Sequence, residues 1–416
     1  MNKANLLLVA LLGVSSSAAC NPSAGPPARS EILDSAGLKI IWSRGGRWGV
    51  GEAWTVSDRP ALSIGALGGP EAYQFVAVSG AARLPDGDIV VVDRGAKTVR
   101  IFDSSGSFLK TLGGPGSGPG EFQEPGSVTL GRGNTLAIWD NLLFRMTRFD
   151  ETGEPSDIQT LDLAQIAKAV EPPLYPGRVE PLPNGDFLVR LVEKGGKAFP
   201  SGVFRPRSGA LRVAGDLSTI DTLMFFGDTA RIAVDAPFGR YPVALPLAVG
   251  TLATHQGDPP KICIGDQTGP QVACFVQGEA RTLIRWDPES RPVGEEEIAD
   301  WREANLRLFG QKLRGEDILS MLDQVPLPTV APEYSQIILD RGMNLWVKLG
   351  PTPRSGSFSF DYLVFDPSGL LLGMVVLPPV TVLEIGDDYF LGLFRDEFEV
   401  EYVQLYEISK PSGGMD

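Results

Sequence analysis

Short runs of apolar residues, separated by clusters of turn-forming residues, recur along most of this chain. The clearest example lies between Leu84 and Leu112, where a Pro-Asp-Gly turn precedes the apolar run 89–92. Two further runs, 99–102 and 108–112, follow after hairpin-length turns. Runs of this kind, bounded by Gly, Pro, Asp and Ser, are typical of β-strands joined by hairpins. The segment therefore predicts three adjacent antiparallel strands.

The same pattern returns along the chain to give six copies. The second strand of successive copies begins near Ile89, Leu136, Phe187, Ile262, Leu345 and Phe390. Internal repeats of this kind are typical of β-propellers, in which each copy forms one blade. The last copy lacks a fourth strand, and the segment 38–64 holds spare strand-like residues that could pair with it and hide its open edge. We therefore expect an all-β fold, a six-bladed β-propeller closed by an N-terminal strand.

Two motifs carry a resemblance to a known family. The segment 120–125, Gly-Glu-Phe-Gln-Glu-Pro, resembles the blade junction of NHL repeats, and the segment 91–103 resembles the body of that repeat. Over residues 48–408 the chain is similar to a group of uncharacterised bacterial six-bladed propeller lipoproteins. The resemblance implies a fold and a location at the cell envelope, and it implies no activity.

A polar stretch with helical spacing interrupts the strand pattern at about 294–322, between the fourth and fifth copies. Its glutamates at 295–297 suit the start of a helix, where the helix dipole favours negative charge. Two apolar stripes are expected on it, one from Ile298, Trp301, Leu308 and Phe309 and one from Ile318, Leu319 and Leu322. This helical insertion is either a flap packed on the propeller rim or a lid or partner-docking element. Long loops at 191–202, 227–241 and 350–361 would add contact surface.

The first twenty residues have the features of an export signal: Lys3, a short apolar run and the ending Ser-Ala-Ala-Cys20. The ending resembles a bacterial lipobox, in which Cys20 is lipidated; the alternative is an ordinary cleaved signal with an incidental cysteine. We expect a lipoprotein signal peptide at 1–20, a flexible tether at 21–36 and the propeller at 37–410. The protein would be held at the cell envelope by its lipid anchor, extracytoplasmic and on the outer membrane, since Asn21 is not the residue typical of inner-membrane retention.

The overall charge bears on the class of partner. The formal net charge is −14, with a pI of about 4.7. A strongly acidic surface repels the phosphate backbone, so nucleic acid is not an expected partner.

Beyond Cys20 the chain holds two cysteines and one histidine. Cys263 and Cys274 lie on the two arms of one predicted hairpin, equally far from its middle, where directly opposed residues can form a disulfide. The alternative is a pair of reduced core cysteines. His255, next to a Gly-Asp-Pro-Pro sequence, is expected in a loop rather than as a catalytic base. One histidine excludes a multi-histidine metal site.

Three aspartates occupy the same position at the end of the second strand in different copies: Asp93, Asp140 and Asp266. Equivalent positions of a propeller lie at one level around its axis, so these carboxylates could bind a hard cation such as Ca²⁺. They could instead cap their own turns by accepting hydrogen bonds from backbone N–H groups. Three of the six equivalent positions are apolar, which favours turn capping.

Two classes of function remain open at this point. The first is a binding or protein-interaction module that recognises a protein or a small-molecule ligand. The second is a metal-dependent hydrolase or lyase of the six-bladed propeller type, for which only the three aspartates offer ligands. No catalytic residues are predicted, because the chain offers no nucleophile paired with a base.

Overall fold

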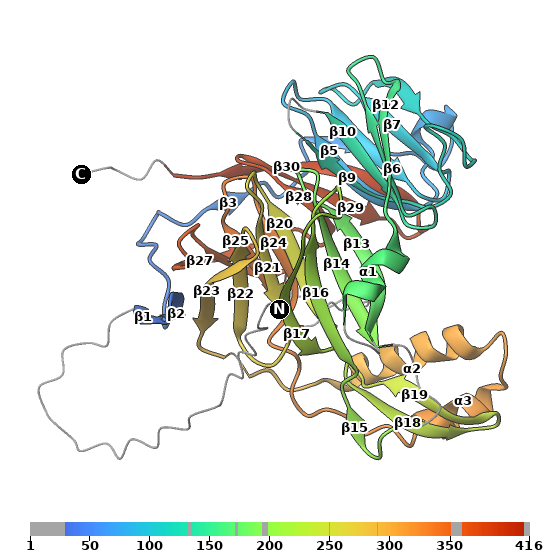
Figure 1. The fold of residues 1–416 in the computed structure, drawn as a ribbon, viewed down its shortest axis with the longest axis vertical. Coiled ribbons are helices and arrows are strands. Elements are labelled where there is room, and N and C mark those ends of the chain that lie inside the picture. The colour runs from blue at the N-terminus through green and yellow to red at the C-terminus, as the bar shows by residue number, and fades with distance from the viewer. Residues whose placement is uncertain are drawn as a thin grey trace, which may run out of the picture.

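The computed structural model describes residues 30–131, 135–170, 174–193, 199–248, 250–288, 290–350 and 360–411. Strands dominate these residues (Figure 1). Cys20 and the expected signal peptide lie outside them. The expected tether at 21–36 is too long, because strand β1 (Ser30–Ser35) already begins at Ser30.

Each of the six sequence copies folds into one antiparallel sheet, and we number these sheets 1 to 6 in chain order. Sheet 1 consists of β5 (Val78–Arg83), β6 (Ile89–Asp93), β7 (Thr98–Phe102) and β8 (Phe108–Leu112). Sheet 2 consists of β9 (Pro125–Leu130), β10 (Leu136–Asp140), β11 (Arg145–Phe149) and β12 (Pro155–Thr160). Sheet 3 consists of β13 (Leu174–Pro181), β14 (Phe187–Glu193), β16 (Arg207–Val213) and β17 (Ile220–Gly227).

The later copies follow the same order of strands. Sheet 4 contains β20 (Leu252–Gln256), β21 (Lys261–Gly265), β22 (Gln271–Val276) and β23 (Glu279–Trp286). Sheet 5 contains β24 (Tyr334–Leu339), β25 (Leu345–Leu349), β26 (Asp361–Phe365) and β27 (Leu371–Val376). Sheet 6 contains β28 (Thr381–Ile385), β29 (Tyr389–Arg395) and β30 (Glu401–Ser409). The six predicted second strands are therefore confirmed as β6, β10, β14, β21, β25 and β29.

Apolar side chains fill the spaces between neighbouring sheets. One buried cluster joins sheets 1 and 2, and corresponding clusters join 2 with 3, 3 with 4, 4 with 5 and 5 with 6. A sixth cluster joins sheet 6 back to sheet 1, with Leu391 and Val91 among its members. The second strands β6, β10 and β25 are buried at every residue because both of their faces meet a neighbouring sheet.

The N-terminal segment pairs with two different sheets. As expected, β3 (Thr55–Val56) and β4 (Leu62–Ile64) add to β30 in sheet 6, with Ile64 opposite Val403. The expectation for 38–42 is wrong, because β2 (Leu38–Ser43) pairs in parallel with β23 of sheet 4. Without β2, the outer strand of sheet 4, β23, would have an open edge just as β30 would without β3 and β4. The hairpin of β1 and β2 covers this edge.

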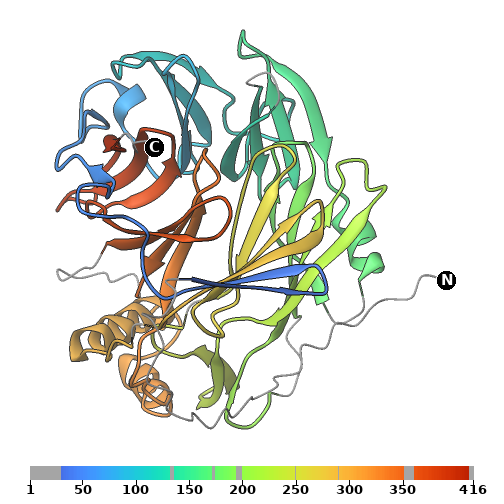
Figure 2. The ribbon, with the colours of Figure 1, turned by 90° about the vertical axis from the view of Figure 1, so that its left-hand side faces the viewer.

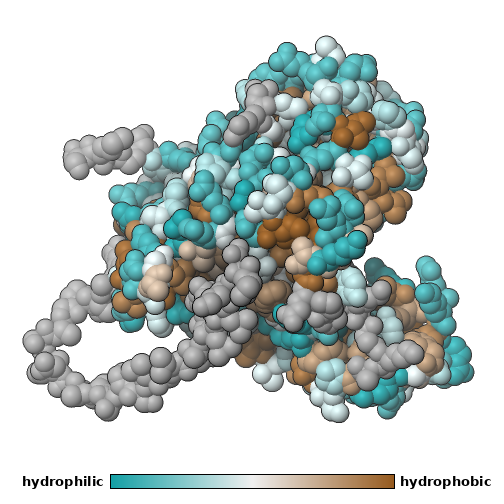
Figure 3. Space-filling view, in the orientation of Figure 1, coloured by the Kyte–Doolittle hydropathy of each residue, from teal (hydrophilic) through white to brown (hydrophobic). Residues whose placement is uncertain are grey.

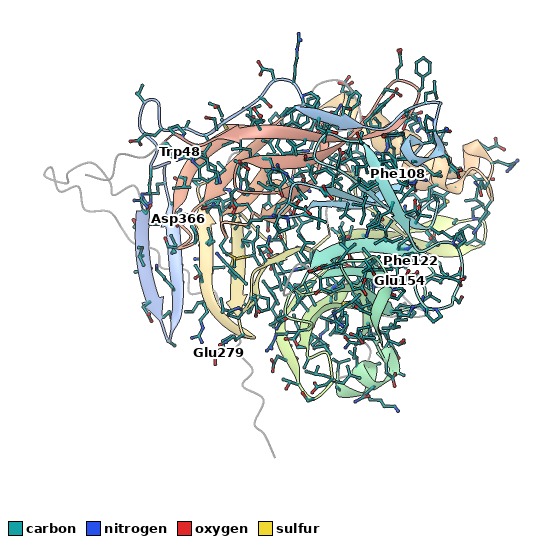
Figure 4. The ribbon with its side chains drawn as sticks, turned by 90° about the horizontal axis from the view of Figure 1, so that it is seen from above. Trp48, Phe108, Phe122, Glu154, Glu279 and Asp366 are labelled. Atoms are coloured by element: carbon teal, nitrogen blue, oxygen red, sulfur yellow. A yellow bond between two sulfur atoms is a disulfide. The ribbon has the colours of Figure 1, made fainter. Side chains whose placement is uncertain are left out.

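Between these two sheets the N-terminal segment runs along sheet 5 (Figure 2). The backbone N–H of Trp48 donates to the carbonyl of Leu372 at 2.9 Å, and the Trp48 indole lies against Gly373. The Trp48 and Trp54 rings are tilted against each other with 5.4 Å between their centroids, and the Trp54 ring in turn lies 5.8 Å from that of Trp346. Trp48 and Asp366 both lie on the side of the molecule along which this segment runs (Figure 4). The segment thus contacts sheets 4, 5 and 6 in turn.

The predicted helical insertion forms α2 (Glu295–Phe309) and α3 (Gly315–Leu322), between β23 and β24. A short helix, α1 (Leu163–Ala169), and a 3₁₀ turn, η1 (Glu71–Tyr73), lie elsewhere in the chain. The expected loop at 227–241 is wrong in part, because it contains β18 (Arg231–Ala236) and the start of β19 (Gly239–Ala244), which form a small sheet with β15 (Val203–Phe204). Parts of the other two expected loops, 194–198 and 351–359, lie outside the described residues.

Candidate functional site

The predicted aspartate ring was the first candidate site. Asp93 is fully buried at the end of β6, where its carboxylate accepts hydrogen bonds from the backbone N–H groups of Val76, Ala77 and Ala96 at 3.0–3.1 Å. The Arg100 guanidinium lies 3.4 Å from the same carboxylate. The oxygens of Asp93 thus hold its own turn and the entry into β5, which is a structural role.

Asp140 repeats this arrangement at the end of β10. One carboxylate oxygen accepts from the N–H groups of Leu142 and Leu143 at 2.8–2.9 Å, and the other accepts from Gln123 and Glu124 at 2.7 and 3.0 Å. Four backbone donors therefore occupy the carboxylate of a side chain that is only 1% exposed.

Asp266 is only half-buried, and one oxygen accepts from the Thr268 N–H and hydroxyl at 3.1 and 2.7 Å. Within the described parts of the chain, no group of three or more His, Cys, Asp or Glu side chains could hold a metal ion. The prediction that Asp93, Asp140 and Asp266 form a metal site is therefore corrected. Each carboxylate accepts backbone hydrogen bonds from its own turn, which is the alternative that the sequence left open, and those of Asp93 and Asp140 also bind the segment that leads into the first strand of their sheet.

The predicted disulfide is confirmed. Cys263 in β21 lies directly opposite Cys274 in β22, and the two sulfurs are bonded. Both residues are buried between sheets 4 and 5. The bond links β21 to β22, the two middle strands of sheet 4, and neither of these cysteines presents a reactive thiol at the surface.

His255 lies in strand β20 and not in a loop as expected. Burial lowers the pKa of its imidazole, and the carboxylate of Glu180 on the neighbouring sheet opposes this shift. Its Nδ1 atom is buried and has no hydrogen-bond partner among the described residues. The imidazole is therefore neutral near pH 7, and no nucleophile is hydrogen-bonded to it in the described structure.

A polar network near His255 was not found from the sequence. Arg190 in β14 donates to the carbonyl of Thr251 at 2.6 Å and lies 3.9 Å from Glu180, and burial lowers the pKa of its guanidinium. Arg205 donates to the carbonyls of Asp228 and Asp266, each at 2.7 Å. Both arginines link sheet 3 to sheet 4 by donating to backbone carbonyls. Every residue has such a carbonyl, so the sequence does not indicate which residues the arginines contact.

A second cluster joins sheets 5, 6 and 1. Glu384 accepts hydrogen bonds from Arg341, from the Tyr389 hydroxyl at 3.0 Å and from the backbone N–H of Arg83 at 2.8 Å. Burial alone would lower the pKa of Arg341, but the adjacent Glu384 carboxylate raises it above the ordinary value. Burial, reinforced by Glu384, also raises the pKa of Tyr389. The charges of Arg341 and Glu384 neutralise each other. The cluster is therefore a structural contact between sheets.

The remaining candidate is what we call the insertion lobe, which comprises β18, β19, α2 and α3. The buried faces of α3 and of the β18–β19 hairpin pack together in one apolar core. This core is formed by Val234 and Val243 from the hairpin and by Ile318, Met321 and Leu322 from α3. Figure 1 shows the lobe projecting from the sheets at the lower right. The helices therefore do not pack on the propeller rim as a flap; they pack on a hairpin supplied by the connection between the third and fourth copies.

The insertion lobe has a pocket of about 410 Å³ lined by Phe238, Tyr241, Leu308, Phe309, Lys312 and Leu313. Leu308 is 70% exposed and Phe238 is 59% exposed. The expected apolar stripe of α2 is therefore wrong for Leu308, which lies at the mouth of this pocket. Leu319, expected in the stripe of α3, is also partly exposed. Apolar surface interrupts the polar surface of the lobe in the space-filling view (Figure 3).

The pocket lining includes one basic residue. Lys312 is the one charged residue in this lining. Nearby charges form ion pairs: Arg307 pairs with Glu303 within α2, and Arg291, which precedes α2, pairs with Glu297. An apolar pocket with a single lysine can take an apolar side chain and a nearby carboxylate.

Comparison with known proteins supports the fold. Residues 79–174 match the DUF5128 family, described as a 6-bladed beta-propeller. No curated protein matches the sequence. The fold is of the β-propeller type. The DUF5128 match covers sheets 1 and 2, where the sequence repeat is also clearest.

Solved structures with a similar fold share little sequence with the chain. A candidate exported protein from Bacteroides fragilis is 12% identical with a TM-score of 0.47, covering 90% of this chain and all (100%) of that one. A member of the DUF4221 family from Bacteroides vulgatus is 9% identical with a TM-score of 0.47, covering 86% and 99%. Virginiamycin B lyase from Staphylococcus aureus is 9% identical with a TM-score of 0.39, covering 86% and 99%.

No helix among the described residues combines the length and the apolar character needed to cross a membrane.

Proposed function

We propose that this protein is an exported, lipid-anchored six-bladed propeller of the NHL-repeat type that acts as a protein-interaction module in the cell envelope. In this proposal sheets 1 to 6 are the blades of one ring, closed by β3 and β4. The apolar cluster that joins sheet 6 to sheet 1 supports closure. The signal-like ending at Cys20 supports export and lipidation.

The observation that carries the interaction role is the exposed pocket of the insertion lobe. Burying one exposed Leu or Phe side chain contributes roughly 1.5–3 kcal/mol, so covering Phe238 and Leu308 together would be a substantial part of a binding energy. Large exposed apolar side chains gathered on one projecting unit are typical of interaction sites. The proposed partner is a protein segment that places an apolar side chain in the pocket and a carboxylate against Lys312.

The pocket can be tested by photo-crosslinking in the native envelope. A photo-activatable amino acid at Gln311, an exposed residue beside the pocket, should give a discrete cross-linked species. The double substitution Phe238→Ser and Leu308→Ser should remove that species without changing the melting temperature. Phe398→Ser, at a residue 68% exposed in the turn between β29 and β30, is the matched control and should leave it unchanged. Equal crosslinking by the double variant would contradict the proposal.

The alternative function, a metal-dependent hydrolase or lyase, gains no support from Asp93, Asp140 and Asp266, whose carboxylates hold their own turns. A panel of lactones and esters tests it directly. Turnover by the purified protein that is lost in the triple Asp→Asn variant would favour the enzyme over the interaction module.

The anchor is tested separately at Cys20. We expect Cys20→Ser to abolish fractionation with the outer membrane, because the lipid would provide the only covalent attachment. Unchanged membrane fractionation of this variant would refute lipid anchoring and would leave the pocket proposal intact.

A further inference from the structure

The β1–β2 hairpin exposes large apolar side chains although it belongs to a folded sheet. Ile32 is 53% exposed, Leu33 is 60% exposed and Trp42 is 38% exposed. The same hairpin contributes Ile41, which is fully buried, to the interior. Its position is therefore fixed by packing, and its apolar outer residues are held in place on the surface.

Leu33 and Trp42 share one face of the extended sheet. Glu31 pairs with Trp42 and Leu33 with Ile40, and directly opposed residues of antiparallel strands point to the same side. On the other side of β2, Ile40 pairs with Leu283 of β23. Leu33, Ile40 and Leu283 therefore form one apolar row across three strands, with Trp42 beside it.

The charge around this row differs from that of the whole chain. Residues 30–47 contain three basic and two acidic side chains, whereas the chain as a whole carries −14. The Arg44 guanidinium lies 5.2 Å from the Trp42 ring, and Arg44 also pairs with Glu31. Tryptophan beside arginine is the combination favoured at the boundary between lipid headgroups and acyl chains.

The hairpin follows directly on the segment that would carry the lipid. Nine residues, 21–29, separate Cys20 from Ser30. Even fully extended, such a segment spans only about 30 Å. A lipid on Cys20 would hold the hairpin at an effective concentration near the membrane surface in the millimolar range, so that even weak contacts would be populated.

We propose that the β1–β2 hairpin docks on the bilayer surface, with Leu33 and Trp42 entering the headgroup region as a second membrane contact. The proposal rests on the lipid anchor of the proposed function. It also fixes the orientation of the molecule, because β1 and β2 lie on the left of Figure 1 and the insertion lobe lies at the lower right. The insertion lobe would then lie away from the membrane surface, where a partner could reach it.

The test replaces the lipid by a tag so that it does not depend on Cys20. A chain beginning at Asn21, with an N-terminal polyhistidine tag, is recruited to phosphatidylcholine vesicles that contain a nickel-chelating lipid. Cys263 and Cys274 are bonded to each other, so a cysteine introduced by Leu33→Cys is the one reactive thiol among the described residues and can be labelled with an environment-sensitive fluorophore. Leu308→Cys, at a residue 70% exposed in the insertion lobe, is the matched control.

We expect the label at position 33 to brighten and shift to shorter wavelength on recruitment, and the label at position 308 to stay unchanged. Trp42→Ser in the Leu33→Cys background should reduce the response without altering the melting temperature. An unchanged label at position 33 would overturn the proposal, as would equal responses at both positions. Cys20→Ser fractionation in cells tests the anchor alone, so failure of the anchor and failure of the hairpin contact are told apart.

Discussion

The carboxylate of Glu401 in β30 accepts a hydrogen bond from the backbone N–H of Val78 in β5, with 2.6 Å between oxygen and nitrogen. The two residues are 323 positions apart in the sequence and join sheet 6 to sheet 1. Arg395 donates to the other oxygen of the same carboxylate at 2.7 and 3.0 Å. One side chain that is 5% exposed therefore links the end of the chain to its first sheet.

Removing this carboxylate should loosen the junction. Glu401→Ala leaves the buried N–H of Val78 without its acceptor, and loss of a hydrogen bond to a charged group costs about 1.5–3 kcal/mol. We expect the free energy of unfolding in urea to fall by that amount. Glu407→Ala, at an exposed position of the same strand, is the control and should change it by less than about 0.5 kcal/mol. Equal effects of the two substitutions would argue against the junction.

A second prediction concerns the N-terminal strand that completes sheet 6. Ile64 in β4 is 2% exposed and packs between sheets 6 and 1. Truncation of a buried isoleucine to alanine costs about 2–5 kcal/mol, so Ile64→Ala should lower the unfolding free energy within that range. Ile32→Ala, at the exposed edge strand β1, should have little effect in solution. If Ile64→Ala is as mild as Ile32→Ala, β4 does not hold the sheet.

The third prediction separates turn capping from metal binding. Asp140→Asn replaces an oxygen that accepts from Gln123 and Glu124 by an amide that cannot, and leaving such buried donors unpaired costs about 1–3 kcal/mol. The same loss is expected with calcium and with a chelator, measured by thermal unfolding. Asp266→Asn, at a half-buried position, should cost about 0.5 kcal/mol or less. A calcium-dependent melting temperature that either substitution abolishes would restore the metal site.

The fourth prediction is a pH dependence of two equivalent turns. Hydrogen bonds from the Ser105 hydroxyl and from the backbone lower the pKa of Asp103, and those from Thr152 and the backbone lower the pKa of Asp150. A lowered carboxyl pKa stabilises the folded state above the ordinary value of 3.8, and this stabilisation is lost as the pH falls through the folded-state pKa.

Asp103→Asn and Asp150→Asn should therefore melt at a lower temperature than the wild type at pH 7. The difference should narrow as the pH falls below 3.8. A difference that stays constant from pH 7 to pH 2 would show that the charge of these carboxylates contributes nothing.

The repeat could be predicted from the sequence because its turns are chemically specific. Gly106, Gly153 and Gly369 of the Phe-Asp-x-x-Gly turns have φ angles of 85°, 94° and 95°, which glycine adopts without strain. The aspartate of each turn accepts backbone hydrogen bonds. Local chemistry of this kind leaves a local sequence signature, and so the strands between the turns were found.

Long-range choices left no such signature. Residues 38–42 could pair with the edge of β23 or the edge of β30, and their apolar alternation suits both edges. The Gly-Asp-Pro-Pro sequence led to the expectation of a loop at His255, but strand β20 continues to Gln256, directly before that sequence. Leu308 fitted a buried stripe on α2, but the helix packs on a hairpin from elsewhere in the chain, and this partner could not be inferred from helical spacing.

The pairing of β4 with β30 and of β2 with β23 also constrains when the protein can mature. A chain that emerges N-terminus first presents residues 30–64 at the start, but β23 at 279–286 follows only about two thirds of the way along and β30 at 401–409 follows near the end. During that interval these strands have unsatisfied edges, which are prone to pair with other chains. Contacts of such long sequence separation also form slowly. The first strands should therefore need protection from other chains until these partners have been made, and a chain that stops before residue 401 would leave β3 and β4 without β30.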